Sequence, residues 1–212
     1  MMSSATFTAG ARMPRYSDDD PYLDPASGVL RNLLGIADEA ALEQTEAAFV
    51  ATRSYELSRT PLKGHFDLAH LQAIHRYLFG DMYEWAGQLR TIDISKGSNR
   101  FAHHAHIGSA AAPIFLELAT ENLLAGVDAA SFSDRAAYYL GELNALHPFR
   151  EGNGRAQREF ISHLAHANGY YIAWENVGQP DMLAAAIKSF HGDTSNLAAL
   201  IRKNLSALDR DG

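Results

Sequence analysis

Residues 147–158 read HPFREGNGRAQR, and the rest of the chain is arranged around this stretch. A helix is predicted to lead into it over residues 134–147, with Ser133-Asp134 as its N-cap. Pro148 ends that helix, because proline excludes the α conformation for the residue before it. Apolar residues recur with a helical period after the stretch, so a second helix is predicted to begin near Gly154. The stretch therefore predicts a helix end, a tight loop and a helix start.

The glycines and arginines of this stretch predict an anion site. Gly152 and Gly154 allow consecutive backbone N–H groups to converge, and the N-terminus of the second helix adds partial positive charge. Arg155 and Arg158 lie three residues apart on one face of that helix, where two guanidinium groups can bind phosphate oxygens bidentately. Two arginines favour a polyphosphate as the ligand.

A carboxylate and an imidazole flank the expected anion site. Glu151 would repel phosphate oxygens unless a hard cation such as Mg²⁺ bridges the two groups. His147 could take a proton from an attacking hydroxyl at near-neutral pH, as a general base does. Taken singly, such a histidine, glycine turn or arginine pair is more often structural or solvated. Their combination at this spacing favours a catalytic site.

The complete pattern His-x-Phe-x-Glu-Gly-Asn-Gly-Arg-x-x-Arg resembles the signature of the Fic family. The resemblance implies an all-α, Fic-type helical domain with a small β-hairpin flap next to the active site. It also implies transfer of AMP from ATP to a Tyr, Thr or Ser hydroxyl of a target protein, with release of pyrophosphate. In this chain it assigns the base to His147, the Mg²⁺ to Glu151, and the ATP phosphates to Gly152, Asn153, Gly154, Arg155 and Arg158.

Two residues refine what the resemblance implies. Phe149 would anchor the loop in the core. Relatives of the Doc type, which act as kinases on a translation factor, are similar but carry lysine at the position of Gly154. Gly154 therefore favours transfer of AMP over transfer of phosphate.

Length and composition bound the alternatives. A chain of 212 residues with 47% hydrophobic composition favours one domain over two. Its formal charge of −7 argues against direct nucleic-acid binding, and the absence of cysteine excludes disulfides and thiolate chemistry. No apolar run has membrane-spanning length, and residues 1–15 lack the apolar segment of a signal peptide. We expect a cytoplasmic protein without a membrane partner.

The chain divides into an arm and a domain. Residues 1–25 show no periodicity and are rich in Ser, Ala, Gly, Asp and Pro, which predicts a flexible N-terminal arm. Residues 26–212 are expected to form a single Fic domain. Caps and apolar spacing predict helices between Asp38 and Pro61, between Asp67 and Gly80, and over residues 107–124, 182–190 and 195–208. The first of these is expected to place Phe49 and Thr52 inward.

A hairpin is predicted between these helices. Residues 89–94 form a short β-prone run, residues 95–99 a turn, and residues 100–102 a second short run. In the Fic family this element is a flap that binds the target segment by strand addition. Lys96 and Phe101 are the candidates for contact with the target or the nucleotide. The alternative is a surface turn with a buried Phe101.

The histidines outside the central stretch are expected to be structural or solvated. His103, His104 and His106 suggest a metal, but strand alternation places only His104 and His106 on one face, without a carboxylate beside them. His70 and His75, five residues apart, have poor helical spacing for shared ligation. The sequence therefore predicts no zinc site.

Regulation is expected to come from another chain. Many Fic proteins carry an inhibitory helix in which Ser or Thr is followed four residues later by Glu and then by Gly or Asn. Thr52 and Glu56 have this spacing, but Leu57 replaces the small residue. The resemblance therefore predicts a small separate antitoxin that places a Glu against Arg158.

The biological role remains open between several possibilities. The resemblance favours a bacterial toxin, with DNA gyrase or topoisomerase IV as candidate targets. The alternatives are a secreted effector that modifies host proteins, a transferase of another nucleotide or phosphate-containing group, and a non-catalytic module that binds nucleotide or target.

Overall fold

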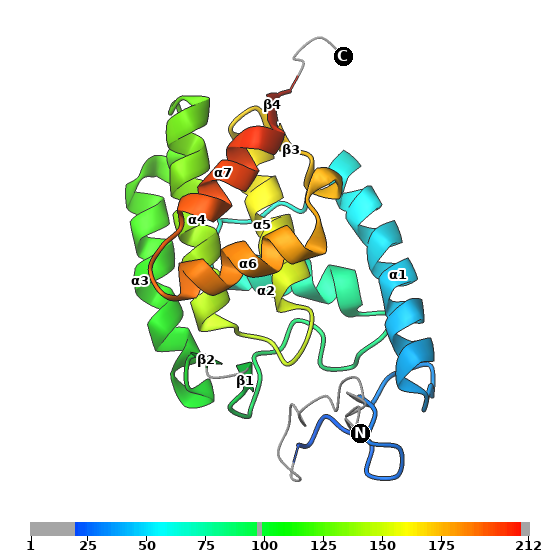
Figure 1. The fold of residues 1–212 in the computed structure, drawn as a ribbon. Coiled ribbons are helices and arrows are strands. Elements are labelled where there is room, and N and C mark those ends of the chain that lie inside the picture. Colours follow the sequence, from blue (N-terminus) through cyan, green and yellow to red (C-terminus); the bar gives the residue numbers. More distant parts are fainter. Residues whose placement is uncertain (1–19, 97–98, 209–212) are drawn as a thin grey trace, which may run out of the picture.

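The structure is a computed structural model and describes residues 20–96 and 99–208. Within these ranges helices dominate, and α5 runs through the middle of the domain (Figure 1). Two small antiparallel sheets, β1-β2 and β3-β4, lie at opposite ends (Figure 1). The helices are α1 (Glu39–Arg59), α2 (Leu68–Phe79), α3 (Ile107–Thr120), α4 (Ala129–Leu146), α5 (Asn153–Ala167), α6 (Gln179–Phe190) and α7 (Ser195–Asn204), with short 3₁₀ turns η1 (His104–His106), η2 (Asn122–Leu124) and η3 (Trp174–Asn176).

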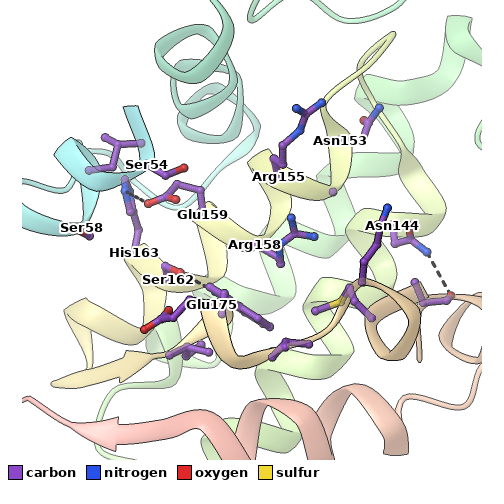
Figure 2. A pocket seen from close by; sticks show the side chains of 18 of the residues that line it. Ser54, Ser58, Asn144, Asn153, Arg155, Arg158, Glu159, Ser162, His163 and Glu175 are labelled. Atoms are coloured by element: carbon purple, nitrogen blue, oxygen red, sulfur yellow. Dashed lines mark hydrogen bonds and ion pairs between the residues drawn. The ribbon is translucent and has the colours of Figure 1, made fainter. Parts of the chain in front are cut away.

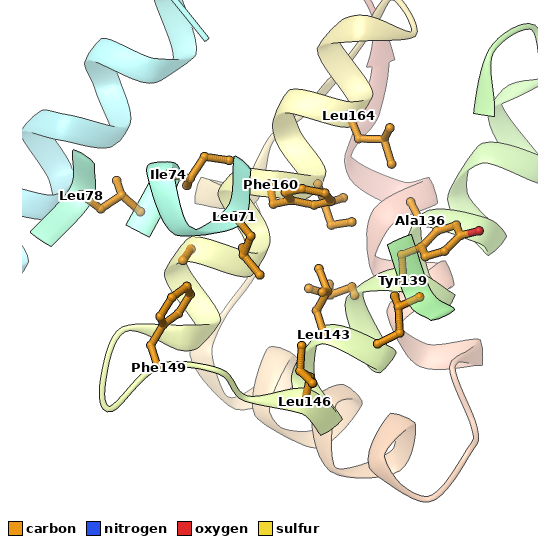
Figure 3. Packing of buried hydrophobic residues seen from close by; sticks show 14 of the residues in the cluster. Leu71, Ile74, Leu78, Ala136, Tyr139, Leu143, Leu146, Phe149, Phe160 and Leu164 are labelled. Atoms are coloured by element: carbon orange, nitrogen blue, oxygen red, sulfur yellow. The ribbon is translucent and has the colours of Figure 1, made fainter. Parts of the chain in front are cut away.

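The hydrophobic core surrounds α5. Phe160 of α5 lies among side chains of α2, such as Leu71, and of α4, such as Leu143, and all three are buried (Figure 3). Truncating a buried phenylalanine of this kind to alanine costs about 3–5 kcal/mol. The core therefore fixes α5 on its inner side, where Asn153, Ala156 and Gln157 of the first turns are buried, while Arg155 and Arg158 are only partly buried.

The predicted starts of two helices need correction. The N-cap of α4 is Asp128, whose carboxylate accepts from Ala130 N–H at 2.8 Å, five residues before the predicted cap. Ser133 is instead buried inside the helix. Helix α6 begins at Gln179 with a proline in its first turn, a position that needs no N–H donor, so it starts three residues earlier than predicted.

Two helices end earlier than predicted. Helix α3 stops at Thr120, because residues 122–124 take left-handed backbone angles. Helix α7 stops at Asn204, and β4 (Leu205–Ala207) then pairs with β3 (Tyr170–Ile172), with Tyr171 opposite Ser206. The extended aromatic run at β3 was predicted, but its partner strand was not.

The flap is shorter than predicted and its strands lie elsewhere. β1 (Ser95–Lys96) pairs with β2 (Asn99–Arg100), so the pairing falls almost wholly within the predicted turn, residues 95–99, and only Arg100 belongs to a predicted strand. Residues 89–94 form no strand, because they are bonded to the loop between α4 and α5, which we call the central loop (residues 147–152). Arg90 N–H donates to Pro148 O of this loop at 2.9 Å. The hairpin therefore stands directly beside the end of α4.

Part of the expected arm is packed on the domain. Asp20 and Arg150 form a buried ion pair, with 2.7 Å between Oδ2 and Nη2. Leu23 and Leu30 form an isolated β-bridge. Residues 20–25 are therefore tied to the loop that carries the central stretch, whereas residues 1–19 lie outside the described range. In the part of the chain that the structure covers, no helix is long and apolar enough to cross a membrane.

Candidate active site

The loop between α4 and α5 is closed by its own side chains. Phe149 N–H donates to Asn153 Oδ1 at 2.8 Å, and Asn153 Nδ2 donates to Phe149 O at 2.7 Å. Phe149 is fully buried, as predicted. The Asn153 amide is thus used within the loop, so only its backbone can serve an anion.

Gly152 is required by the backbone and by its surroundings. Its φ is +77°, in the left-handed region, and an added Cβ would overlap the Phe79 ring. Gly154 differs, since it is helical and a Cβ there would meet only Arg158 Nη1, at 3.6 Å. The fold tolerates a side chain at residue 154, so the glycine is not needed for packing. Its effect is to leave the space in front of the helix N-terminus unfilled.

His75 of α2 holds the loop through a hydrogen bond and a ring stack. Its Nε2 donates to Glu151 O at 2.9 Å, its Nδ1 accepts from Gly87 N–H at 2.9 Å, and its ring stacks on Phe149 at 3.8 Å. Burial lowers the pKa of His75 to about 4, so the ring is neutral at physiological pH. The prediction of a structural histidine is confirmed, and His70 is likewise buried, with its pKa lowered by burial.

His147 caps the C-terminal end of α4 in a left-handed conformation, with φ 45° and ψ 63°. Its Nδ1 lies 3.2 Å from Asn144 O and donates to it, which makes Nε2 the basic nitrogen of the neutral ring. The Phe101 ring stacks on the imidazole with centroids 3.8 Å apart and planes inclined by 14°. The imidazole is therefore oriented by contacts on its face and at one nitrogen.

A cavity of about 830 Å³ opens beside this loop. It lies between the C-terminal half of α1, α5 and α6 (Figure 2), and residues of β3 and of the flap segment, among them Ser95 and Phe101, also line it. The predicted site residues that line it are His147, Glu151, Asn153, Gly154, Arg155, Arg158 and Phe101. Gly152 supports the loop behind them, and Lys96 lies in β1.

Arg158 supplies positive charge to the cavity. Its side chain extends from α5 into the cavity (Figure 2), and no hydrogen bond or ion pair joins it to another residue within 20–96 or 99–208. Burial and the neighbouring Arg155 lower the pKa of Arg158, yet an arginine keeps its charge at any physiological pH. A half-buried guanidinium that makes no hydrogen bond or ion pair with a carboxylate of the described residues favours an anionic ligand.

Among the described residues, Arg155 forms ion pairs with two carboxylates of the protein, unlike Arg158. Its Nη1 lies 2.6 Å from Glu46 Oε1 of α1, and its Nη2 lies 3.6 Å from Glu151 Oε1. The Tyr83 hydroxyl donates to the other oxygen of Glu46, and burial beside that carboxylate raises the pKa of Tyr83. Arg155 is therefore anchored along one edge by α1.

Glu151 is a carboxylate of the cavity lining that could hold a metal. Its side chain is 36% exposed, and its backbone is fixed by His75. Magnesium is commonly bound by one or two carboxylates together with phosphate oxygens and water. A single carboxylate facing an anion site therefore fits Mg²⁺ bound jointly with a nucleotide.

The histidines after the flap have a carboxylate beside them that sequence reasoning missed. Asp93 Oδ1 lies 3.0 Å from His104 Nδ1, and Asp93 Oδ2 lies 3.3 Å from His103 Nε2. His103 Nδ1 accepts from Ala105 N–H at 3.2 Å, so its proton sits on the nitrogen that faces Asp93. Arg90 Nη1, 3.7 Å from Asp93, adds positive charge. One carboxylate and two imidazoles thus lie within 4.8 Å of one another, so the expectation that no carboxylate lies beside these histidines is wrong.

Known proteins are similar to this chain in sequence and in fold. The sequence pattern of the Fic/DOC family matches residues 65–165. Protein adenylyltransferase VbhT of Bartonella schoenbuchensis is 54% identical over 188 residues, which are 89% of this chain and 39% of that protein. A probable protein adenylyltransferase Fic of Salmonella typhimurium is 40% identical and is matched over 92% of its length and 88% of this chain.

Solved structures agree with these relatives. The N-terminal Fic domain of a putative cell filamentation protein from Bartonella quintana, with bound ADP, is 27% identical with a TM-score of 0.85, covering 89% of this chain and 95% of that one. BepC of Bartonella tribocorum, with bound AMPPNP, is 26% identical with a TM-score of 0.83, covering 88% and 96%. The predicted all-α Fic fold, with a flap beside the cavity, is confirmed. The chain belongs to the Fic/DOC family.

Proposed function

We propose that this protein is a Mg²⁺-dependent protein adenylyltransferase that transfers AMP from ATP to a hydroxyl side chain of a target protein. The observation that carries the proposal is Arg158, a half-buried cation that extends into the cavity without a partner among the described residues. Relatives named protein adenylyltransferases, and solved relatives with bound ADP and AMPPNP, support ATP as the substrate.

The residues account for each step of the transfer. The target hydroxyl oxygen bonds to the α-phosphorus, the bond from that phosphorus to the β-bridging oxygen breaks, and pyrophosphate leaves. His147 Nε2 takes the hydroxyl proton, since Nδ1 is occupied as a donor to Asn144. Arg158, Arg155 and the N-terminus of α5 balance charge on the phosphates. Mg²⁺ on Glu151 would neutralise phosphate oxygens when bound.

Gly154 supports transfer of AMP. Its lack of a side chain leaves the space beside Arg158 open, although the fold would accept a Cβ there. A long cation at this position, as in the Doc type, would occupy that space. The open space favours a nucleotide whose α-phosphate faces the hydroxyl.

We propose further that inhibition comes from a separate antitoxin that places a Glu against Arg158. The internal candidate, Glu56, accepts from Arg53 at 2.9 Å and from the Tyr77 hydroxyl at 2.8 Å, and so is engaged away from Arg158. Purification of the chain alone in a form that is neither inhibited nor toxic would contradict this proposal.

The toxin role has one rival supported by an observation. Solved relatives include proteins described as VirB-translocated effectors, which favours a secreted effector that modifies host proteins. For a toxin, DNA gyrase and topoisomerase IV are the candidate targets. Labelling in a bacterial lysate but not in a eukaryotic lysate would support the toxin, and the reverse result would support the effector.

The testing experiment uses purified protein, Mg²⁺, ATP labelled in the α-phosphate, and a bacterial and a eukaryotic lysate. We expect a labelled protein band with the wild type and none with His147→Ala. ATP binding by His147→Ala should remain close to that of the wild type, because the base does not hold the phosphates. Absence of label in both lysates with intact ATP binding would favour a non-catalytic module, and equal loss of binding and transfer would contradict the role of His147 as base.

A further inference from the structure

We propose that residues at the two ends of the flap hold the imidazole of His147 in its orientation, with Phe101 and Arg90 as the positioning residues. The inference rests on the proposed function, because it assigns these residues to the same catalytic base. Phe101, a predicted candidate for contact with the target or the nucleotide, also stacks on the His147 ring. Arg90, for which the sequence predicts no role, donates to the His147 carbonyl.

Phe101 holds the face of the imidazole. The two rings are stacked with centroids 3.8 Å apart, and Phe190 of α6 packs edge-on against Phe101 at 5.8 Å. The hydrogen bond from His147 Nδ1 to Asn144 O acts at the ring edge. A flat neighbour on one face and a fixed nitrogen leave the imidazole little rotation, so Nε2 has a defined direction.

Arg90 joins both ends of the flap to the backbone of His147. Its guanidinium is buried and donates to Ile92 O before β1, at 2.6 Å, and to Ala102 O after β2. Its Nε donates to His147 O at 2.9 Å. Three carbonyls from three segments thus converge on one planar cation, which matches the fixed fork of its donors.

Two further contacts close this arrangement. Ala102 N–H donates to Ala145 O of α4 at 3.3 Å, which ties the end of the flap to the helix that carries His147. Asp93, next to Arg90, accepts from His104 N–H at 2.8 Å, so the segments before and after the hairpin are also joined to each other. A displacement of the flap therefore moves the support of the imidazole.

The first test separates positioning from contact with the target. Phe101→Leu keeps an apolar side chain but removes the flat ring, and Phe101→Tyr restores the ring. Initial rates of labelling are measured on a dilution series of one lysate. We expect Phe101→Leu to lower the maximal rate about tenfold or more, since small displacements of catalytic groups have large effects. The half-saturating lysate concentration and the ATP affinity should change by less than about threefold, and Phe101→Tyr should recover most of the rate.

Phe115→Leu is the matched control, because Phe115 is a buried core aromatic that does not line the cavity. It should lower thermal stability while leaving the labelling rate near the wild-type value below the unfolding transition. A raised half-saturating lysate concentration in Phe101→Leu with an unchanged maximal rate would assign Phe101 to the target and overturn the inference. An unchanged rate in Phe101→Leu would overturn it as well.

A second test does not depend on activity. In NMR spectra of the protein with labelled histidine side chains, loss of the Phe101 ring current should shift the imidazole C–H signals of His147 downfield, with Phe101→Tyr close to wild type. Arg90→Lys should broaden or split the same signals, because lysine cannot bind three carbonyls in one plane. Unmoved His147 signals in both Phe101→Leu and a folded Arg90→Lys would contradict the inference. Absence of labelling by the wild type would instead refute the proposed function.

Discussion

The two glycines of the central stretch provide a matched pair of substitutions with opposite expected effects. Gly152→Ala forces a side chain into a left-handed conformation, which costs about 1–2 kcal/mol, and against the Phe79 ring, which costs about another 1–3 kcal/mol. The sum is about 2–5 kcal/mol. For a domain of this size, thermal unfolding should occur about 4–20 °C lower.

Gly154→Ala should behave in the other way. Its Cβ meets only Arg158 Nη1, at 3.6 Å, and alanine favours a helix by up to about 1 kcal/mol over glycine. Thermal unfolding should therefore be unchanged or occur at a higher temperature. The added methyl projects into the proposed phosphate space, so the ATP affinity should fall by about tenfold, or about 1.4 kcal/mol.

Calorimetric unfolding and ATP titration of both variants test this pair. The reasoning is refuted if Gly152→Ala is as stable as the wild type, since neither the backbone angle nor the Phe79 contact would then constrain residue 152. It is also refuted if Gly154→Ala loses several kcal/mol of stability while binding ATP normally. In that case the glycine at 154 would serve the fold rather than the ligand.

Three further perturbations have defined outcomes. Burial lowers the pKa of His75 to about 4, below the roughly 6.5 of a histidine in an unfolded chain. Between these pH values the unfolded state therefore binds a proton that the folded state does not. The free energy of unfolding should fall by about 3 kcal/mol as the pH drops from 6.5 to 4. Urea unfolding at several pH values should show a smaller fall for His75→Asn, and an equal fall would contradict the assignment. Asp20→Ala removes the carboxylate of a buried ion pair with Arg150, so denaturant unfolding should reveal a loss of about 3–5 kcal/mol; an unchanged midpoint would contradict that. Arg158→Ala should weaken ATP binding about tenfold or more without lowering the melting temperature, and unchanged ATP affinity in titration calorimetry would remove Arg158 from the site.

The central loop and the helices around it follow from local sequence rules. Proline after His147, glycine at a left-handed position and a capping aspartate before α1 and before α2 act within a few residues, so the sequence alone indicates them. The cavity residues of α5 were predicted for the same reason. Their fixed spacing on one helix places them on one face.

Contacts between distant segments could not be predicted in this way. The prediction that Phe49 and Thr52 of α1 point inward is wrong, since both are exposed. Glu46 is buried in α1 instead, because its carboxylate pairs with Arg155 of α5. Asp20 is buried for the same kind of reason. From sequence alone, a charged residue is predicted to be exposed unless its partner is known to lie beside it in space. In both cases the partner is more than a hundred residues away along the chain.

The flap shows how a local preference yields to a tertiary contact. Residues 89–94 have β-prone side chains, but Arg90 within them is surrounded by carbonyls of other segments, and the strand pairing moves to Ser95–Lys96 and Asn99–Arg100. Strand preference depends on what a segment packs against. The sequence shows only an arginine within the run, and its burial among carbonyls became visible only in the structure.

Transfer of AMP with His147 as the base can be tested directly. The most direct measurement compares ATP labelled in the α-phosphate with ATP labelled in the γ-phosphate, using the wild type and His147→Ala in the same lysate. We expect a labelled protein from the α-label only, and none with His147→Ala. Label from the γ-phosphate would show phosphate transfer, and label retained by His147→Ala would show that another group acts as the base.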